Sequence, residues 1–271
     1  MNYITQKQFN GRDSDLPTIR LYGITIHAIS EKDCINYVLN SLDDNRGGWI
    51  VTPNLDHLYR LVHDQDFFNL CANADLTVAD GMPLVWASRL QRTPLPERIA
   101  GSTLTISLSS NAAIRNKKIF LLGGANNTAE KAAANLQRTI DHIEIVGVFS
   151  PIIVNNLSDN VLQMIVQQLD VAKPDIVYVA LGSPKQERLI AKLRVRFPSV
   201  WFIGVGISFS FIAGDVKRAP SWIQKIGLEW IHRFVQEPRR LAGRYLIRGI
   251  PFGMSLLGAS LLKRYSGTQR S

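Results

Sequence analysis

Polar residues follow two apolar runs of this sequence at the points where buried strands are expected to end. The run 49–51 is followed by Thr52 and Asn54, and the run 76–79 is followed by Asp80. In parallel α/β proteins, ligands bind just beyond the carboxyl ends of the strands, so these three polar side chains are expected at one ligand-binding edge. A carboxylate in this place can take a proton from a substrate, which makes Asp80 a candidate general base.

Two further polar segments follow apolar runs and extend this candidate site. Arg98 lies on the loop 94–101, where a guanidinium can bind an anionic group of a substrate. Gln186 lies on the segment 182–188, which follows the apolar run 176–181 and opens a helix. Asp-Gly and Pro-Asn steps are also ordinary turn sequences, and an Asp before a helix is an ordinary cap. The hypothesis of catalysis therefore depends on the combination of these segments.

A glycine pair gives a weaker indication of phosphate binding. Gly123 and Gly124 form a turn between an expected strand, 118–122, and an expected helix, 128–138. Backbone N–H groups at the start of a helix can bind phosphate in such a turn. Many strand-to-helix turns have this composition without binding a ligand, so both readings stay open for the pair.

The common motifs of cofactor-dependent and metal-dependent enzymes are missing from the sequence. The step 204–206 supplies Gly-x-Gly but not the third glycine of a dinucleotide-binding fingerprint, and there is no Walker P-loop. Two acid-x-acid triplets, 13–15 and 64–66, could hold a divalent cation against a diphosphate. One lies in the N-terminal leader and the other begins a helix, where acids favour the helix dipole. We therefore predict no metal and no other cofactor.

The elements that must position these residues alternate between strand and helix. This alternation predicts an α/β fold of Rossmann-like type, with a mostly parallel sheet flanked by helices and a basic helical appendage at the C-terminus. Strands are expected at 20–29, 49–51, 76–79, 118–122, 143–149, 176–181 and 200–204. Helices are expected at 30–42, 55–62, 66–73, 83–90, 128–138, 158–169 and 184–195. Ser30 and Asp33 are expected to form a capping box at the first of them, and Ser102 is expected to cap one more helix.

Composition and charge divide the chain into three parts. Residues 1–17 form a polar leader, residues 18–216 the α/β catalytic domain, and residues 217–271 the appendage. With 46% hydrophobic and 20% charged residues, the chain is typical of globular proteins. Two isolated cysteines, Cys34 and Cys71, fit a reducing compartment. No signal-peptide pattern starts the chain, and the longest uncharged run, 249–262, is shorter than the ~20 residues of a spanning helix.

The appendage carries the whole net charge of the protein. Residues 217–271 contain eleven Lys or Arg residues against Glu229 and Glu237, which accounts for the formal net charge of +9. A helical pattern begins at Ser221 and is interrupted at Pro238. Arginines recur every fourth residue from Arg240 to Arg248, and aromatic residues such as Trp230 lie in the same part. A basic amphipathic helix of this kind is typical of an anionic membrane surface. The alternative is a solvated helix face that packs on the catalytic domain.

Seven short segments of the chain resemble the WecG/TagA/CpsF family of bacterial glycosyltransferases, glycosyltransferase family 26. They keep their order and spacing from about residue 20 to residue 250. The segments are 51–54, 79–81, 96–101, 182–187, 204–206, 213–220 and 237–241. The resemblance implies transfer of a sugar from a UDP-sugar to a polyprenyl-diphosphate-linked saccharide at the cytoplasmic face of the cell membrane. It also implies an inverting, metal-independent reaction in the biosynthesis of cell-surface polysaccharide or teichoic-acid-type polymers.

The resemblance also implies roles for individual residues. Asp80 matches the proposed base, and Thr52 and Arg98 match polar residues of the active site. The substrate-binding candidates are Asn54, Gln186, Gly123, Gly124, Arg233, Arg240 and Arg244. The three arginines match an appendage that docks on the membrane and helps to complete the site. The chain departs from many members at Phe209-Ser210, where they have Phe-Asp, and this leaves any role for an acid there in doubt.

A competing class is a binding module in which the basic appendage grips nucleic acid or membrane without catalysis. Apolar residues interleaved in the appendage argue against nucleic acid, because they need an apolar partner. The expected partners are therefore a UDP-sugar donor, a polyprenyl-diphosphate-linked acceptor and an anionic membrane surface. Nucleic acid is not expected, and a homo-oligomer remains open, as do the identities of the two sugars.

Overall fold

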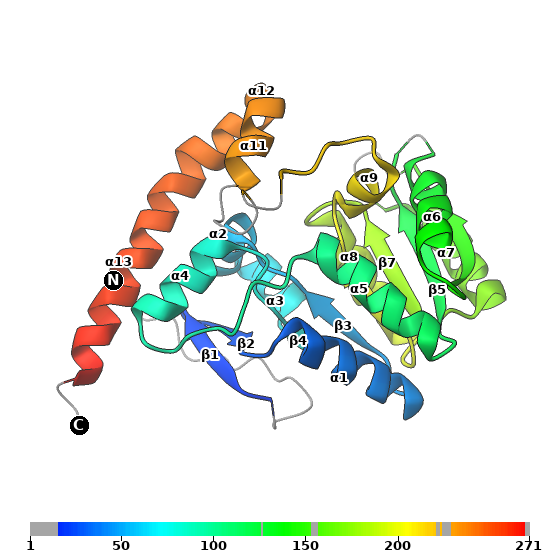
Figure 1. The fold of residues 1–271 in the computed structure, drawn as a ribbon, viewed down its shortest axis with the longest axis horizontal. Helices are drawn as coiled ribbons and strands as arrows, with labels where there is room; N and C mark the ends of the chain where they lie inside the picture. The colour runs from blue at the N-terminus through cyan, green and yellow to red at the C-terminus, as the bar shows by residue number, and fades with distance from the viewer. Residues whose placement is uncertain (1–15, 126, 153–156, 221–222, 224–228, 269–271) are drawn as a thin grey trace.

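The structure is a computed structural model of the chain, and it describes residues 16–125, 127–152, 157–220, 223 and 229–268. The expected leader, apart from its last two residues, lies outside the described part. A parallel sheet with helices on both faces forms the centre of the molecule, and a long C-terminal helix runs along one side (Figure 1).

The central sheet contains six parallel strands, which confirms the predicted α/β class. In sheet order the strands are β4 (Leu76–Thr77), β3 (Gly48–Val51), β8 (Trp201–Gly204), β7 (Ile176–Ala180), β5 (Lys118–Gly123) and β6 (Glu144–Phe149). Because β3, β4 and β8 are neighbours, the loops that follow them meet at one end of the carboxyl edge. The expected strand at 20–29 is an antiparallel hairpin, β1 (Thr18–Leu21) and β2 (Ile24–His27), outside this sheet.

Helices cover both faces of the sheet and form two apolar clusters with it. On one face lie α1 (Glu31–Asp43), α5 (Gly101–Ile114), α6 (Thr128–Thr139) and α9 (Ser208–Ala213). On the other lie α2 (Leu55–His63), α3 (Gln65–Cys71), α7 (Asp159–Ala172) and α8 (Lys185–Arg196). The helix α4 (Met82–Leu90) packs against β1 and the C-terminal helix.

Helix starts follow local sequence chemistry, with one exception that matters for the site. Ser30 and Asp33 form the predicted capping box at the start of α1. The expectation that Ser102 caps the next helix is wrong, because α5 begins at Gly101 and its N-cap residue is Ala100. The N-cap residue Ala100 provides no side-chain cap, and the first N–H of α5, that of Gly101, instead donates to the Asp80 carboxylate.

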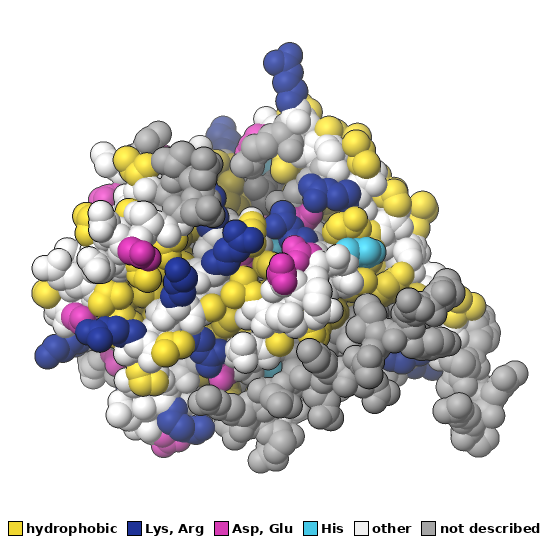
Figure 2. Space-filling view, turned by 180° about the vertical axis from the view of Figure 1, so that it is seen from behind, with side chains coloured by type: hydrophobic (Ala, Val, Ile, Leu, Met, Phe, Trp, Pro, Cys, Tyr) yellow, Lys and Arg dark blue, Asp and Glu magenta, His cyan; other side chains and the backbone are white. Residues whose placement is uncertain are grey.

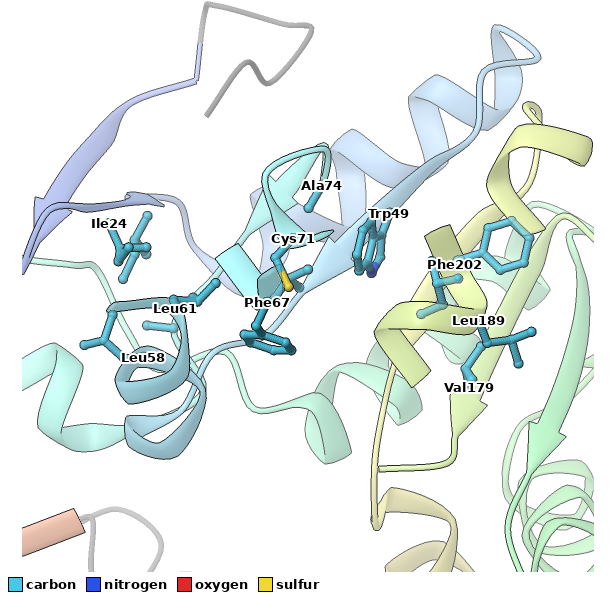
Figure 3. Packing of buried hydrophobic residues seen from close by; sticks show 14 of the residues in the cluster. Ile24, Trp49, Leu58, Leu61, Phe67, Cys71, Ala74, Val179, Leu189 and Phe202 are labelled. Carbon is cyan, nitrogen blue, oxygen red and sulfur yellow. The ribbon is translucent and has the colours of Figure 1, made fainter. Parts of the chain in front are cut away.

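Large aromatic side chains fill the layer between the sheet and α3 and α8. Trp49 of β3 and Phe202 of β8 are buried with Phe67, Cys71 and Leu189 (Figure 3). Burying one such side chain contributes about 2–3 kcal/mol of apolar transfer free energy. The strand ends that carry the candidate site residues are therefore anchored in a rigid core.

The C-terminal part consists of helices that follow one another closely. Their bounds are α11 (Glu229–Gln236), α12 (Pro238–Ala242), the π-helical segment η1 (Gly243–Gly249) and α13 (Ile250–Thr268). The predicted interruption at Pro238 is confirmed, since this residue begins a new helix. The expected helix start at Ser221 lies outside the described residues.

Helix α13 shares the apolar core of the catalytic domain. Phe252 and Leu256 are buried on α4 and α2, and the Phe252 ring meets the rings of Tyr22 and Tyr59 edge-on. The Tyr22 hydroxyl and Ser255 Oγ form a hydrogen bond of 2.9 Å. The part expected as an appendage is thus joined to the domain along its last helix.

The outer face of the same helix leaves apolar side chains in solvent. Exposed residues along α13 are Ile250, Met254, Leu261 and Leu262, and Leu246 and Ile247 of the preceding segment η1 are exposed as well. In Figure 2, seen from behind, hydrophobic side chains gather along the edge of the molecule where α13 lies. The helix Tyr245–Arg264 has 20 residues with a mean hydropathy of 1.3, so by length and composition it could cross a membrane. This corrects the sequence expectation that no stretch reaches spanning length, which counted only the uncharged run 249–262.

Candidate active site

Asp80 lies where the loops after β3 and β4 are tied to the loop before α5. Its backbone N–H donates to the Pro53 carbonyl at 2.9 Å, and the Ile99 N–H donates to the Ala79 carbonyl at 2.8 Å. These bonds place three loops side by side at the carboxyl edge of the sheet. The expected convergence of Thr52, Asp80 and Arg98 at one edge is therefore present in the structure.

Gly101, the first residue of α5, brings the helix start against the two strand ends. A Cβ at Gly101 would lie 3.5 Å from Thr52 Oγ1 and 3.9 Å from Asp80 Oδ2. The Gly101 backbone N–H donates to the Asp80 carboxylate. Thr52 is buried at 6% exposure, whereas Asp80 is half-buried. The carboxylate thus sits at a helix N-terminus, where the dipole favours negative charge.

The surroundings of Asp80 raise its pKa to about 7. Burial of the carboxyl is the largest cause, and the charge of Glu229 raises the pKa further. The positive charges of Arg98 and Arg218 and the Gly101 N–H oppose the shift. A carboxyl with a near-neutral pKa exchanges protons readily at physiological pH, which is the property of a general base.

An ion-pair network lies beside this carboxyl and joins the catalytic domain to α11. Arg98 donates from one terminal nitrogen to Glu229 Oε2 at 3.1 Å, and Arg218 Nε donates to Glu229 Oε1 at 3.3 Å. Arg218 also donates to Thr103 Oγ1 of α5 at 3.1 Å. The side chains of Arg98 and Glu229 are each only 16% exposed, so water screens this pair less than a surface pair.

Asn54 and Gln186 use much of their hydrogen-bonding capacity within the protein. Asn54 caps α2, since its Oδ1 accepts from the N–H groups of Asp56 and His57 at 3.0 and 3.1 Å. Gln186 is only 3% exposed, and its Oε1 accepts from the Gly206 N–H at 3.1 Å. Each side chain therefore shapes a loop at the carboxyl edge.

The side-chain nitrogen of Gln186 also forms a hydrogen bond within the protein. Its Nε2 donates to Glu187 Oε1 at 3.0 Å and lies 2.6 Å from where a Cβ on Gly204 would be. Only glycine fits at position 204 while Gln186 keeps this place. Gln186 thus holds the turn after β8, so the side chain expected to bind substrate also has a structural role.

The glycine turn after β5 is explained by close packing of strands. The Gly124 N–H donates to the Ala180 carbonyl at 2.9 Å, and a Cβ on Gly123 would lie 2.7 Å from the same oxygen. Both glycines have positive φ angles, +96° and +87°. The Gly124 N–H is thereby used within the protein, although Gly123 and Gly124 do lie on the same edge as the site.

The structure gives only backbone positions for the three arginines of the expected substrate-binding set. Arg233 lies in α11, Arg240 in α12 and Arg244 in η1, and their side chains lie outside the described part. Arg233 follows Glu229 by one helical turn on the same helix. Its backbone is therefore close to the ion-pair network in sequence and in space.

Three participants in the site were missed by sequence reasoning: Glu229, Arg218 and the Gly101 N–H. Glu229 could have been singled out, because it is one of only two acids among residues 217–271, which are otherwise strongly basic. A single acid in a basic segment suggests a specific ion-pair partner. In the structure, Glu229 pairs with Arg98 and Arg218.

A protein-built metal site is not found in the described part of the chain. No three His, Cys, Asp or Glu side chains there gather closely enough to hold an ion. Positive charge near Asp80 comes instead from arginine side chains and the start of α5. Asp80 can therefore accept a proton, and the arginine side chains and the start of α5 beside it can stabilise an anion.

Comparison with known proteins assigns these features to one family. The model of the glycosyl transferase WecG/TagA/CpsF family matches residues 19–266. This range contains every candidate residue of the site, together with the C-terminal helices up to the end of α13's hydrophobic part. It also contains all seven segments that carry the sequence resemblance.

Characterised relatives share about a third of the residues. The chain is 33% identical over 202 residues to the N-acetylglucosaminyldiphosphoundecaprenol N-acetyl-beta-D-mannosaminyltransferase of Bacillus subtilis (strain 168), covering 73% of this chain and 75% of the relative. It is 34% identical over 206 residues to the protein of the same description from Staphylococcus aureus (strain MW2), covering 76% and 78%. These proteins transfer a sugar to a lipid-diphosphate-linked sugar, as their descriptions state.

Proposed function

Because the chain belongs to the glycosyl transferase WecG/TagA/CpsF family, we propose that it transfers a hexosyl or N-acetylhexosaminyl group from a UDP-sugar to a polyprenyl-diphosphate-linked saccharide. The family resemblance expected from the seven sequence segments is confirmed by the match. The relatives' acceptor, an undecaprenyl-diphosphate-linked N-acetylglucosamine, and their N-acetylmannosaminyl product guide the choice of substrates to test. The product belongs to the biosynthesis of a cell-envelope polymer.

The observation that carries this proposal is the Asp80 carboxyl, with a pKa of about 7, beside Arg98 and a helix N-terminus. In a single inverting displacement, the acceptor hydroxyl oxygen bonds to the anomeric carbon of the donor sugar. The bond between that carbon and the UDP oxygen breaks at the same time. Asp80 takes the hydroxyl proton, and UDP leaves with the bonding electron pair.

Arg98 and the start of α5 are suited to the charge that develops on the leaving diphosphate. Arg98 is mostly buried, so its charge acts over a short distance with little screening by water. The start of α5 has no side-chain cap from Ala100 and favours anions, although its Gly101 N–H already donates to Asp80. These protein groups support the proposal that the reaction proceeds without a metal ion, because they supply the positive charge that a cation often provides.

The exposed apolar face of α13 supports attachment to the inner face of the cell membrane. Met254 and Leu262 are 66% and 73% exposed, while Phe252 and Leu256 hold the helix on the domain. A helix held in this way can lie in the membrane surface with its outer side chains in lipid, whereas spanning requires it to leave α4 and α2. We therefore favour peripheral attachment, which brings the site to a lipid-linked acceptor.

A substrate screen tests the activity directly. UDP-N-acetylmannosamine, UDP-N-acetylglucosamine, UDP-glucose and UDP-galactose are each incubated with a short-chain polyprenyl-diphosphate-N-acetylglucosamine, and products are identified by mass. One donor should give a product heavier by one sugar, and NMR of its anomeric centre should show inversion. Absence of transfer from every UDP-sugar, with vesicles present and the protein folded, would contradict the proposal.

Binding to vesicles separates this function from the nucleic-acid alternative. The protein is mixed with vesicles containing anionic lipid or with duplex DNA at the same salt concentration. Vesicle binding that exceeds DNA binding supports a lipid-facing appendage. The reverse order would support a basic binding module instead.

A further inference from the structure

Glu229 has no place in the proposed reaction, yet it is the centre of the charged network beside the base. Its two carboxylate oxygens accept from two different arginines, Arg98 at 3.1 Å and Arg218 at 3.3 Å. Within the described residues, Arg98 pairs with Glu229 and not with Asp80. Glu229 of α11 thus pairs with Arg98, which could otherwise pair with the Asp80 carboxylate.

Three segments supply the groups that face Asp80. The loop before α5 supplies Arg98, α5 supplies the Gly101 N–H, and the C-terminal part supplies Glu229 and Arg218. Arg218 is fixed on both sides, since it also donates to Thr103 of α5 at 3.1 Å. The network is therefore a rigid chain in which one carboxylate sets the position of both guanidinium groups.

We propose that Glu229 is a positioning residue that holds Arg98 and Arg218 in place and keeps Arg98 from forming a direct ion pair with Asp80. A direct pair would stabilise the ionised carboxylate and weaken it as a base. It would also occupy the guanidinium edge that a diphosphate needs. The C-terminal helices therefore control the ionisation of Asp80, in addition to attaching the protein to a membrane. This inference rests on the proposed function of Asp80.

The test measures the ionisation of Asp80 with and without the Glu229 charge. The Asp80 carboxyl carbon is followed by NMR against pH in the full-length protein, with its signal assigned from Asp80→Asn. In Glu229→Gln, Arg98 is released and one negative charge is lost, so the pKa of Asp80 should fall by about one unit or more. Asp141→Asn, which removes one exposed charge from a turn after α6, is the matched control and should leave it unchanged.

Activity gives a second reading of the same change. The acid limb of kcat/KM in Glu229→Gln should move to lower pH by a similar amount, and kcat at pH 8 should fall at least tenfold. Glu229→Asp keeps the charge on a shorter side chain and should give an intermediate shift, which also serves if Glu229→Gln does not fold. A pKa of Asp80 that stays at its wild-type value in both folded variants overturns the proposal. Because the NMR titration needs no substrate, failure of the proposed glycosyl transfer would leave this result interpretable.

Discussion

The central sheet and the C-terminal helix α13 bury their apolar residues to very different degrees. All five residues of β7 are buried, and four of them have no exposed surface. On α13, Phe252 and Leu256 are buried, but Met254 and Leu262 on the other side are mostly exposed. The apolar side chains of the sheet are buried within the domain, whereas those of α13 are buried on one side only. This difference supports the proposal that the exposed side of α13 meets an apolar partner such as a membrane.

Removal of the C-terminal helices should have the largest effect on turnover and on membrane binding. A chain ending at Pro220 lacks both the exposed apolar face and Glu229 of the ion-pair network. We expect it to fold and stay off vesicles, and to lose roughly a thousandfold or more in turnover, since anchor and electrostatic support are lost together. Its melting temperature should fall, because Tyr22 and Tyr59 lose Phe252. Full activity on a lipid-linked acceptor would show that the site belongs to the sheet alone.

A change confined to the sheet edge should abolish most turnover without detaching the protein. Asp80→Asn should lower kcat by roughly two orders of magnitude or more and leave vesicle binding intact, because only the base is removed. Near-normal turnover in the folded variant would refute the role of Asp80.

The same variant should also be more stable at high pH. The pKa of Asp80 is raised by folding to about 7, so ionisation costs folding free energy as the pH rises from about 4 through 7. At pH 8 the melting temperature of Asp80→Asn should be higher than that of the wild type by about 2–6 °C. At pH 4 the two proteins should melt together. Calorimetry at both values checks the sign.

Two substitutions on α13 compare its inner and outer faces directly. Leu256→Ala on the buried face should lower the free energy of unfolding by about 2–4 kcal/mol. Met254→Ala on the exposed face should change it by less than about 0.5 kcal/mol but weaken vesicle binding severalfold. Denaturant unfolding and vesicle co-sedimentation measure the two effects. Equal effects of the two variants on stability would mean that both faces are packed in solution.

The smallest effect is expected from removal of divalent cations. Arg98 of the domain and Arg218 of the C-terminal part both place positive charge near Asp80, and we propose that this charge serves in place of a metal ion. Turnover in EDTA should therefore match turnover with added magnesium within about a factor of two, a free-energy difference of only a few tenths of a kcal/mol. Activity that is lost in EDTA and restored by manganese or magnesium would contradict metal independence.

Strand ends and helix starts could be predicted because they depend on local sequence. The Ser30 and Asp33 capping box and the polar residues after β3 and β4 are examples, since apolar runs and turn residues mark them directly. The short helix α9 was not expected, because six residues are too few to show a helical period. The prediction that Ser102 caps a helix was wrong, because α5 begins two residues earlier than a cap at Ser102 requires.

Thr52 and Asp80 were predictable because they follow strands, and Arg98 because it lies in a polar loop. The Arg98–Glu229 pair joins residues 131 positions apart, so it depends on how α11 packs, which no local pattern encodes. Gln186 shows the opposite kind of difference. A polar residue after a strand suggests ligand binding, but the side-chain amide of Gln186 holds the turn at Gly206. Local sequence patterns therefore predicted the fold and the candidate base Asp80, whereas the ion-pair network of Arg98, Arg218 and Glu229 depends on tertiary packing.

The contact between Tyr22 and Ser255 has a consequence for how the protein is made. Tyr22 stands 233 positions before Ser255, so it leaves the ribosome long before the helix residue that it binds. N-terminal segments generally fold first during synthesis, and the sheet can therefore form before α13 docks. Docking of α13 is then a late step of folding, and its exposed apolar side appears only on a chain whose sheet has already formed.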